Sequence, residues 1–227
     1  METFPAPPAP SADKLRGGYY TPPAVARFIA AWASAAGPRV LEPSCGDGAV
    51  LAALAEHLGE AGLRRGAVGV ELNPGEAAKA ARHGLPVVTA DFFAWFGHAH
   101  HGAFDAVVGN PPYIRFGSWS ERTRVLAFGL MRAAGLRPSR LVNAWVPFTV
   151  AAVLALRPGG RVALVLPAEL LQVGYAAPLR EFLAERLASL TIVSFRRLVF
   201  GGVLQEVVLL LGEVASVDVG VVSGRNS

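Results

Sequence analysis

Short apolar segments alternate with helical patterns along most of this 227-residue chain, and this alternation constrains the fold more than any other feature. Strands are predicted at 39–41, 67–71, 86–89, 104–108, 161–166, 191–195 and 207–211. Helices are predicted between them, at 23–35, 50–58, 75–82, 143–156 and 177–187. Because strands that alternate with helices form a mostly parallel sheet covered on both faces, the chain is predicted to be an α/β protein.

The end of the chain departs from this alternation. The segments 191–195 and 207–211 have no helical pattern between them, so we expect them to pair as an antiparallel hairpin at one edge of a seven-stranded sheet. Residues 1–16 are rich in Pro and Ala and are expected to form a disordered leader. One domain is expected over 17–213, followed by a tail at 214–227.

Composition excludes several classes of protein. No apolar run is long enough to cross a bilayer, and the start of the chain lacks the apolar core of a signal peptide. A single cysteine, Cys45, excludes an internal disulfide and fits a reducing cytoplasm. The 21 basic against 17 acidic side chains permit an anionic partner, but the Arg-rich composition can equally be a bias of the source genome.

A glycine loop follows the first predicted strand. Gly46 and Gly48 let a backbone approach a ligand closely, and the amide groups of the next helix start can bind anions. Glu42, at the strand end, can face the ammonium group of a ligand, and Pro43 and Ser44 belong to the same candidate binding loop. The alternative is an ordinary strand-to-helix turn.

Two further motifs follow the next two predicted strands. Glu71 lies about 20 residues beyond Gly48, the spacing at which an acid binds ribose hydroxyls in nucleotide-binding α/β folds. Leu72 would offer an apolar face to an adenine ring. Asp91 can accept a hydrogen bond from an adenine amino group, with Phe92 packed on the ring. The alternatives are an acid at a helix start for Glu71, and a helix cap with a core aromatic for the second pair.

The most informative motif is Asn110-Pro111-Pro112-Tyr113, which follows the fourth predicted strand. An aromatic amine is a poor nucleophile because its lone pair is delocalised into the ring. The Asn110 side-chain oxygen and the Pro111 carbonyl can each accept one N–H and draw the nitrogen toward pyramidal geometry, while the prolines hold both acceptors rigid. Tyr113 supplies a face for stacking. A Pro-rich turn is the alternative, but three preceding strand-end motifs argue against it.

These motifs together resemble the class I, Rossmann-like methyltransferases, and specifically the DNA adenine-N6 methyltransferases of TaqI-type and type I restriction-modification systems. The resemblance covers 17–212. It implies that Tyr20 and Thr21 close over the methionine end of the cofactor, that Phe148 sandwiches its adenine, and that Phe200 packs against the target base. The candidate cofactor-binding residues are therefore Tyr20, Thr21, Glu42, Pro43, Ser44, Gly46, Gly48, Glu71, Leu72, Asp91, Phe92 and Phe148, and the candidate catalytic residues are Asn110, Pro111, Pro112, Tyr113 and Phe200.

The resemblance implies S-adenosyl-L-methionine as the cofactor, DNA as a partner, no metal and no membrane. The methyl group would pass directly to the exocyclic amino group of an adenine flipped out of the duplex. Flipping costs a few kcal/mol, which stacking on Tyr113 and Phe200 would offset. The histidines at 98, 100 and 101 could form a metal site, but no suitably spaced ligand set accompanies them.

Sequence-specific members of this family carry a recognition domain after the catalytic one, and 214–227 is too short to form it. A short form, a separate specificity subunit or an incomplete segment would each explain this. Other acceptors also stay open: a protein glutamine amide or an RNA amino group. A non-catalytic cofactor-binding subunit of a defence complex is a further alternative. Arginines between 115 and 140 can bind phosphates or simply face solvent.

Overall fold

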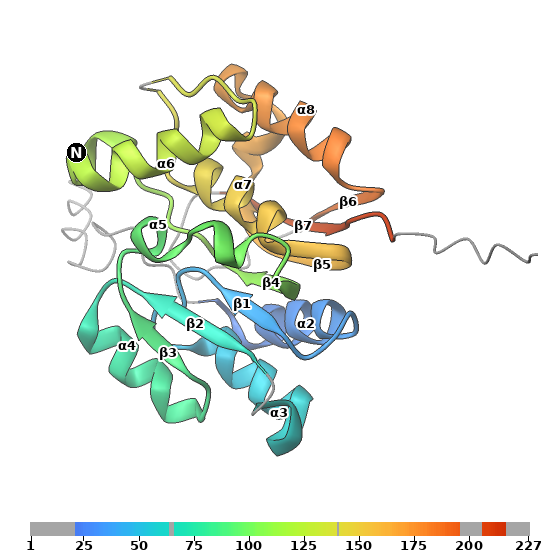
Figure 1. Ribbon diagram of the computed structural model, residues 1–227. Coiled ribbons are helices and arrows are strands. Elements are labelled where there is room, and N and C mark those ends of the chain that lie inside the picture. Colours follow the sequence, from blue (N-terminus) through green and yellow to red (C-terminus); the bar gives the residue numbers. More distant parts are fainter. Residues whose placement is uncertain (1–20, 64–65, 140, 196–205, 217–227) are drawn as a thin grey trace, which may run out of the picture.

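The computed structural model describes residues 21–63, 66–139, 141–195 and 206–216. Seven strands form one sheet in the order β3-β2-β1-β4-β5-β7-β6 (Figure 1). They are β1 (Val40–Glu42), β2 (Val68–Glu71), β3 (Val87–Thr89), β4 (Phe104–Gly109), β5 (Leu156–Pro167), β6 (Ser189–Ser194) and β7 (Val207–Glu213). The expected leader and most of the expected tail lie outside the described residues, so the division into domains stays a prediction.

The sheet is mostly parallel, as predicted. β1 pairs in parallel with both β2 and β4, so that Leu41 lies opposite Val68 on one side and Val107 on the other. The predicted antiparallel hairpin is confirmed, because β6 pairs antiparallel with β7. β7 also pairs antiparallel with β5, which places it inside the sheet and leaves β6 at the edge. The order reverses between β1 and β4, where α/β sheets bind ligands at their carboxyl ends.

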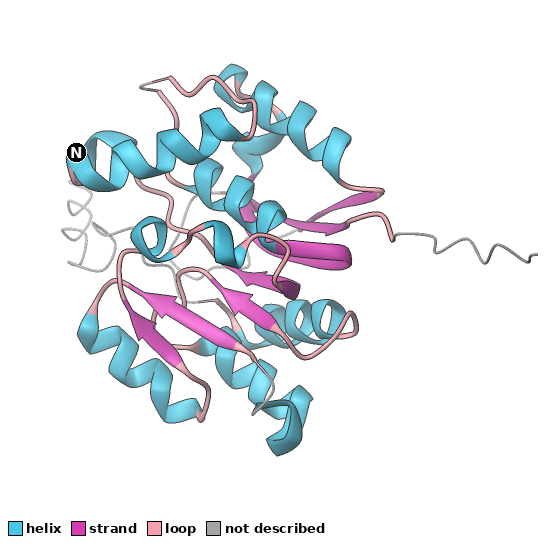
Figure 2. Cartoon of the chain, viewed as in Figure 1, coloured by secondary structure: helices cyan, strands magenta, loops and turns pink. Residues whose placement is uncertain are grey.

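Helices cover both faces of the sheet (Figures 1 and 2). One layer contains α2 (Pro23–Ser34), α3 (Ala49–Leu63, interrupted by non-helical Gly59) and α4 (Pro74–Ala80). The other contains α5 (Phe92–Trp95), α6 (Glu121–Ala133), α7 (Trp145–Ala155) and α8 (Ala177–Arg186). None of the described helices is long and apolar enough to pass through a membrane.

Two hydrophobic cores result, one on each face. Along β5, Ala163 and Val165 belong to the core beneath α2 and α3, whereas Val162 and Leu164 belong to the core beneath α7 and α8. Successive side chains of a strand point to opposite faces, so a strand covered on both sides is apolar throughout. This explains the continuous apolar runs in the sequence.

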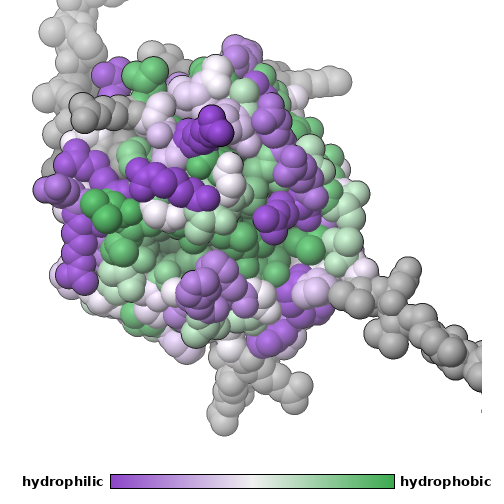
Figure 3. Space-filling model, turned by 45° about the horizontal axis from the view of Figure 1, so that its top comes forward, coloured by the Kyte–Doolittle hydropathy of each residue, from purple (hydrophilic) through white to green (hydrophobic). Residues whose placement is uncertain are grey.

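On the outer surface of the α6–α8 layer, hydrophilic residues lie among hydrophobic ones (Figure 3).

The structure departs from the predicted elements most clearly at α5, α6 and β5. The helices α5 and α6 were not predicted, although Ser120 caps α6 by accepting from the Thr123 backbone N–H, as a typical N-cap does. Strand β5 begins five residues early, at Leu156, because Leu156 pairs with Phe104 before the register shifts at the glycine turn. Gly159 permits this turn, since its φ of 72° is unfavourable for other residues.

Asp105 joins three strands at the opposite, amino-end edge of the sheet. Its carboxylate accepts from the Arg39 backbone N–H at 3.0 Å, from Arg39 Nη2 at 2.9 Å and from Arg157 Nε at 2.5 Å. Arg157 also donates to the carbonyl of Ala36, which follows α2. Burial opposes ionisation of this carboxyl, but the hydrogen bonds from Arg39 and Arg157 outweigh it and lower the pKa of Asp105 to about 2. The network therefore fixes the base of the sheet beneath the candidate site.

Candidate functional site

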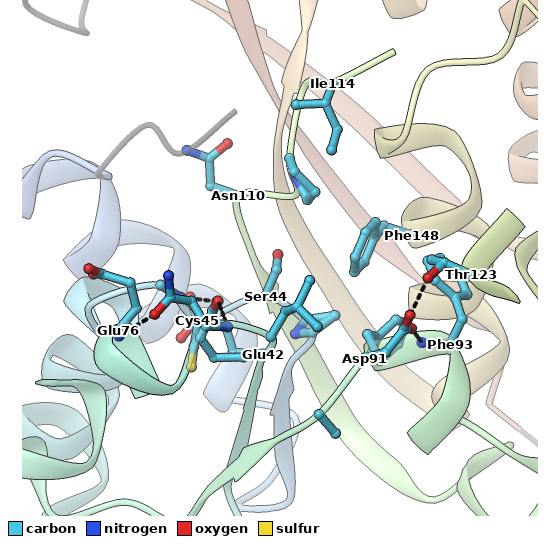
Figure 4. A pocket seen from close by; sticks show the side chains of 18 of the residues that line it. Glu42, Ser44, Cys45, Glu76, Asp91, Phe93, Asn110, Ile114, Thr123 and Phe148 are labelled. Atoms are coloured by element: carbon cyan, nitrogen blue, oxygen red, sulfur yellow. Dashed lines mark hydrogen bonds between the residues drawn. The ribbon is translucent and has the colours of Figure 1, made fainter. Parts of the chain in front are cut away.

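A cavity of about 740 Å³ opens at the carboxyl ends of β1, β2, β3 and β4 (Figure 4). This is the edge at which the sequence motifs were expected to meet. The loops after each of these strands contribute to its wall, as do the start of α6 and one ring from α7. A small-molecule cofactor fits such a volume, because ligand sites in proteins commonly measure about 300–1,000 Å³.

The glycine loop lies at the centre of the wall, and its two glycines have different roles. Gly46 has a φ of 54°, and a Cβ there would point into open space beside the cavity, so a ligand can approach the backbone. Gly48 has a φ of 90°, and a Cβ would lie 2.7 Å from Ala80 Cα. Gly48 therefore permits α3 to pack against α4 and does not line the cavity.

Glu71 holds this loop against β2. Its Oε2 accepts from the Gly46 backbone N–H at 2.9 Å, and its Oε1 accepts from the Asn73 backbone N–H at 2.7 Å. Each carboxylate oxygen has two acceptor positions, so both can still accept from hydroxyls of a ligand. Leu72 is 69% exposed and lies on the cavity wall, an exposure that a packed core residue would not have.

Glu42 is the most deeply buried acid of the site, with 3% of its surface exposed. Its Oε2 is buried without a hydrogen-bond partner among the described residues. Burial raises the pKa of the Glu42 carboxyl well above its ordinary value, and the charges of Asp47 and Glu71 raise it further. A buried carboxylate oxygen without a hydrogen-bond partner is costly, so Oε2 of Glu42 is suited to a cationic ligand.

The charged side chains that line the cavity in the described part of the chain are all acidic. Among the described lining residues there are five acids and no Lys, Arg or His; the acids are Glu42, Asp47, Glu71, Glu76 and Asp91. A dinucleotide pyrophosphate would meet repulsion in such a wall. A cofactor with positive groups would meet attraction.

Aromatic rings form the other end of the cavity. Phe148 stacks on Phe92 with centroids 5.1 Å apart and meets Phe93 edge-on at 4.9 Å, and Trp119 lies 6.0 Å from Phe148. Asp91 lies beside these rings and caps α5, since its Oδ1 accepts from the Phe93 N–H at 2.9 Å. Because Phe92 and Phe148 already stack on each other, a flat ring system can pack against this aromatic cluster but not between the two phenyl groups.

The Asn110 loop borders the cavity across from Asp91 and Phe93 (Figure 4). Asn110 and Pro112 line it, whereas Pro111 is buried. The loop begins at Gly109, whose φ of 151° turns the chain away from β4. The Tyr113 hydroxyl donates to the Val165 carbonyl at 2.9 Å, which ties the ring to β5 outside the cavity wall.

The structure brings most of the sequence-predicted site residues to this one cavity. Twelve line it: Thr21, Glu42, Pro43, Ser44, Gly46, Glu71, Leu72, Asp91, Phe92, Asn110, Pro112 and Phe148. Three lie near it without lining it: Gly48, Pro111 and Tyr113. Tyr20 and Phe200 lie outside the described residues. The roles assigned to these residues stay predictions.

Sequence reasoning missed the wall formed by the segment before and within α6. Ser118, Trp119, Ser120 and Thr123 all line the cavity, and the Thr123 hydroxyl donates to Asp91 Oδ2. The signal that could have revealed this segment is the N-cap pattern of Ser120, followed by Glu121 in the first turn. Three arginines obscured the amphipathic pattern of the helix.

Three other features of the sequence lie apart from the cavity or contribute little chemistry. His100 stacks on Trp95 at 3.9 Å, and no cluster of three metal-ligand side chains occurs in the described part of the chain. Burial raises the pKa of the Cys45 thiol, which makes it a poor nucleophile. The arginines of α6 are mostly exposed, and Arg132 lies 5.8 Å from the centre of the Phe128 ring. Phosphate binding by them stays a prediction.

Known proteins resemble this chain in sequence and in fold. A family model described as Eco57I restriction-modification methylase matches residues 72–200. The type II methyltransferase M.TthHB8I of Thermus thermophilus is 36% identical over 191 residues, which cover 78% of this chain and 40% of that protein. The chain spans less than half the length of the curated relatives it matches.

Solved structures agree with the fold. A modification subunit of a putative type I restriction enzyme from Vibrio vulnificus has a TM-score of 0.67 at 20% identity, over 91% of this chain and 46% of that one. A putative class I S-adenosylmethionine-dependent methyltransferase from Listeria monocytogenes has a TM-score of 0.66 at 16% identity, over 87% of this chain and 60% of that one. The chain has the Rossmann-like class I methyltransferase fold, and it belongs to the Eco57I restriction-modification methylase family.

Proposed function

We propose that this chain transfers a methyl group from S-adenosylmethionine to the exocyclic amino group of an adenine in DNA. The observation that carries the proposal is the acidic cavity, which ends at the Asn110 loop. S-Adenosylmethionine carries an ammonium and a sulfonium group, both positive. The absence of basic side chains from the described cavity wall favours it over cofactors that carry phosphates.

The residues present fit this cofactor from end to end. Glu42, whose buried Oε2 has no partner in the described chain, would accept from the ammonium group. The carboxylate of Glu71 would accept from the ribose hydroxyls beside Gly46, where no Cβ obstructs the approach. Asp91 would accept from the adenine amino group, and Phe148, which is stacked on Phe92, would pack against one face of the ring. Leu72 would cover the other face of the adenine ring.

Bound S-adenosylmethionine supplies a methyl group that is already activated by the positive sulfur. Asn110 and Pro111 would act on the other reactant, since their oxygens can accept the two N–H groups of the target amine and release its lone pair. The N–CH₃ bond then forms as the S–CH₃ bond breaks, and the surplus amino proton leaves to water. Because a proline follows each of Asn110 and Pro111, the two acceptors need little reorganisation.

DNA is the proposed acceptor because the family is one of restriction-modification methylases. An adenine inside a duplex must be flipped to reach Asn110, and the Tyr113 ring, held through its hydroxyl by Val165, is the proposed stacking surface. A separate specificity subunit remains part of the proposal, and so does a cytoplasmic location.

The test is methyl transfer from radiolabelled cofactor to duplex DNA, single-stranded DNA, RNA and a glutamine-containing peptide. Digestion of the labelled DNA to nucleosides and mass spectrometry should identify N6-methyladenine. Label in cytosine would overturn the adenine assignment, and label only in RNA or peptide would overturn the assignment to DNA. Transfer to no acceptor, with the cofactor bound, would favour a cofactor-binding subunit.

A further inference from the structure

The side chain of Thr123 reaches from α6 to the adenine end of the cavity. Its hydroxyl contacts Asp91 Oδ2, and the two residues face each other across the cavity wall (Figure 4). Asp91 belongs to the loop after β3, and Thr123 lies in the first turn of α6. The contact therefore joins two segments that are 32 residues apart and that both line the cavity.

The other oxygen of Asp91 is fixed by the backbone. Its Oδ1 accepts from the N–H of Phe93 at 2.9 Å and from the N–H of Ala94 at 3.3 Å, as the N-cap of α5. These bonds set the rotation of the carboxylate. Oδ2 is consequently the oxygen that can face a ligand, and Thr123 sets its direction from the opposite side.

The donor and the acceptor can be assigned in each hydrogen bond around the Thr123 hydroxyl. The single hydroxyl proton of Thr123 is donated to Asp91 Oδ2. In the 2.7 Å contact between Ser120 Oγ and Thr123 Oγ1, the donor is then Ser120. Ser120 Oγ in turn accepts from the Thr123 backbone N–H at 3.1 Å. The helix start thus holds the Thr123 hydroxyl in one orientation.

We propose that Thr123 is a positioning residue that aims Asp91 Oδ2 at the 6-position of the cofactor purine and so selects a 6-amino over a 6-oxo ring. This inference rests on the proposed function, in which Asp91 accepts from the adenine amine. Oδ2 has two acceptor positions, one for Thr123 and one for the cofactor N–H. A 6-oxo purine presents an acceptor there, which Oδ2 would repel.

The test compares the binding of S-adenosylhomocysteine and S-inosylhomocysteine by calorimetry, because the two differ at the 6-position and in the protonation of the neighbouring ring nitrogen. The wild-type chain should prefer the adenosyl compound by about tenfold or more. Thr123→Val keeps the shape of the side chain and removes the hydroxyl, so it should lower this preference about fivefold. Thr123→Ser keeps the hydroxyl, so it should keep the wild-type preference for the adenosyl compound. A role in packing alone would move both affinities together.

Asp91→Asn gives an independent readout. The backbone N–H groups of Phe93 and Ala94 require the amide oxygen at the Oδ1 position, so the amide nitrogen takes the Oδ2 position. Nδ2 can then donate to a 6-oxo group, and the preference should reverse toward the inosyl compound. Melting curves check that each variant folds. Thr123→Ala, with its higher helix propensity, is the second hydroxyl-free variant if the Val variant does not fold.

An unchanged preference in the hydroxyl-free variants would overturn the role of Thr123. If Asp91→Asn still alters the preference in that case, the proposed cofactor site stands. If neither compound binds to the wild-type chain, the proposed function fails and this inference fails with it.

Discussion

Replacing Asp105 with Asn tests the account of how the sheet is held beneath the site. The carboxylate accepts from two guanidinium groups, and its side chain is only 6% exposed. Asn is similar in shape but uncharged, so it removes the ion pairs and leaves the packing unchanged. We expect Asp105→Asn to lower the free energy of unfolding at neutral pH.

The pKa of Asp105 sets the size of this effect. A carboxyl pKa lowered from its ordinary 3.8 to about 2 corresponds to about 2 kcal/mol of stability. A group whose folded-state pKa is lowered stabilises the fold above its unfolded pKa, and this contribution is lost as the pH falls toward the folded value. The contribution should therefore be full above about pH 5 and should decline between about pH 4 and 2.

Urea unfolding of the wild-type and variant chains at a series of pH values measures both features. The difference in stability should be about 2 kcal/mol at pH 7 and should shrink as the pH falls below about 4. Glu213→Gln is the matched control, because Glu213 pairs with Arg161 at 3.2 Å where both side chains are about one-third exposed. That change should cost less than about 0.5 kcal/mol. A difference for Asp105→Asn that does not vary with pH would refute the reasoning.

Two further predictions concern the cavity, and a third concerns the Asn110 loop that borders it. Cofactor affinity should rise with pH, because the Glu42 carboxyl, whose pKa is raised, must lose its proton to bind a cation. Glu42→Gln should abolish this pH dependence. Calorimetry in buffers of different ionisation enthalpy measures the protons released on binding. Gly46→Val should weaken the binding of S-adenosylhomocysteine at least tenfold, which is about 1.4 kcal/mol. The valine side chain would enter the cavity, and the φ of 54° at this position is unfavourable for it. Gly97→Ala, in an exposed loop, serves as the control. Tyr113→Phe should cost about 1 kcal/mol of stability in thermal melts through loss of the bond to Val165, and an unchanged melting temperature would contradict this.

The residues that the sequence identified best are those at strand ends. Glu42, Glu71, Asp91 and Asn110 each follow an apolar run, and parallel strands bring their carboxyl ends to one edge. The topology thus converts four separate motifs into one cavity wall. The order of strands and helices in the sequence was sufficient to predict that these four motifs meet, because their meeting does not depend on how individual side chains pack.

The contacts between elements could not be predicted in the same way. Thr123 reaches Asp91 only because α6 packs against α5 and α7, and no local pattern encodes that packing. Gly48 looked like a ligand-binding glycine, but its conformation serves the contact between α3 and α4. The depth of Glu42 also depends on the surrounding layers, since a strand-end acid is ordinarily exposed.

The central claim is that Asn110 readies a planar amine for methyl transfer, and one measurement tests it most directly. The single-turnover rate of methyl transfer should be compared between wild-type and Asn110→Ala chains at saturating cofactor and DNA, with the affinity for S-adenosylhomocysteine measured in parallel. We expect the rate to fall by about 10²–10³ while the affinity changes less than about threefold, as expected when one preorganised hydrogen-bonding group is removed. A variant that transfers methyl groups at the wild-type rate would contradict the claim.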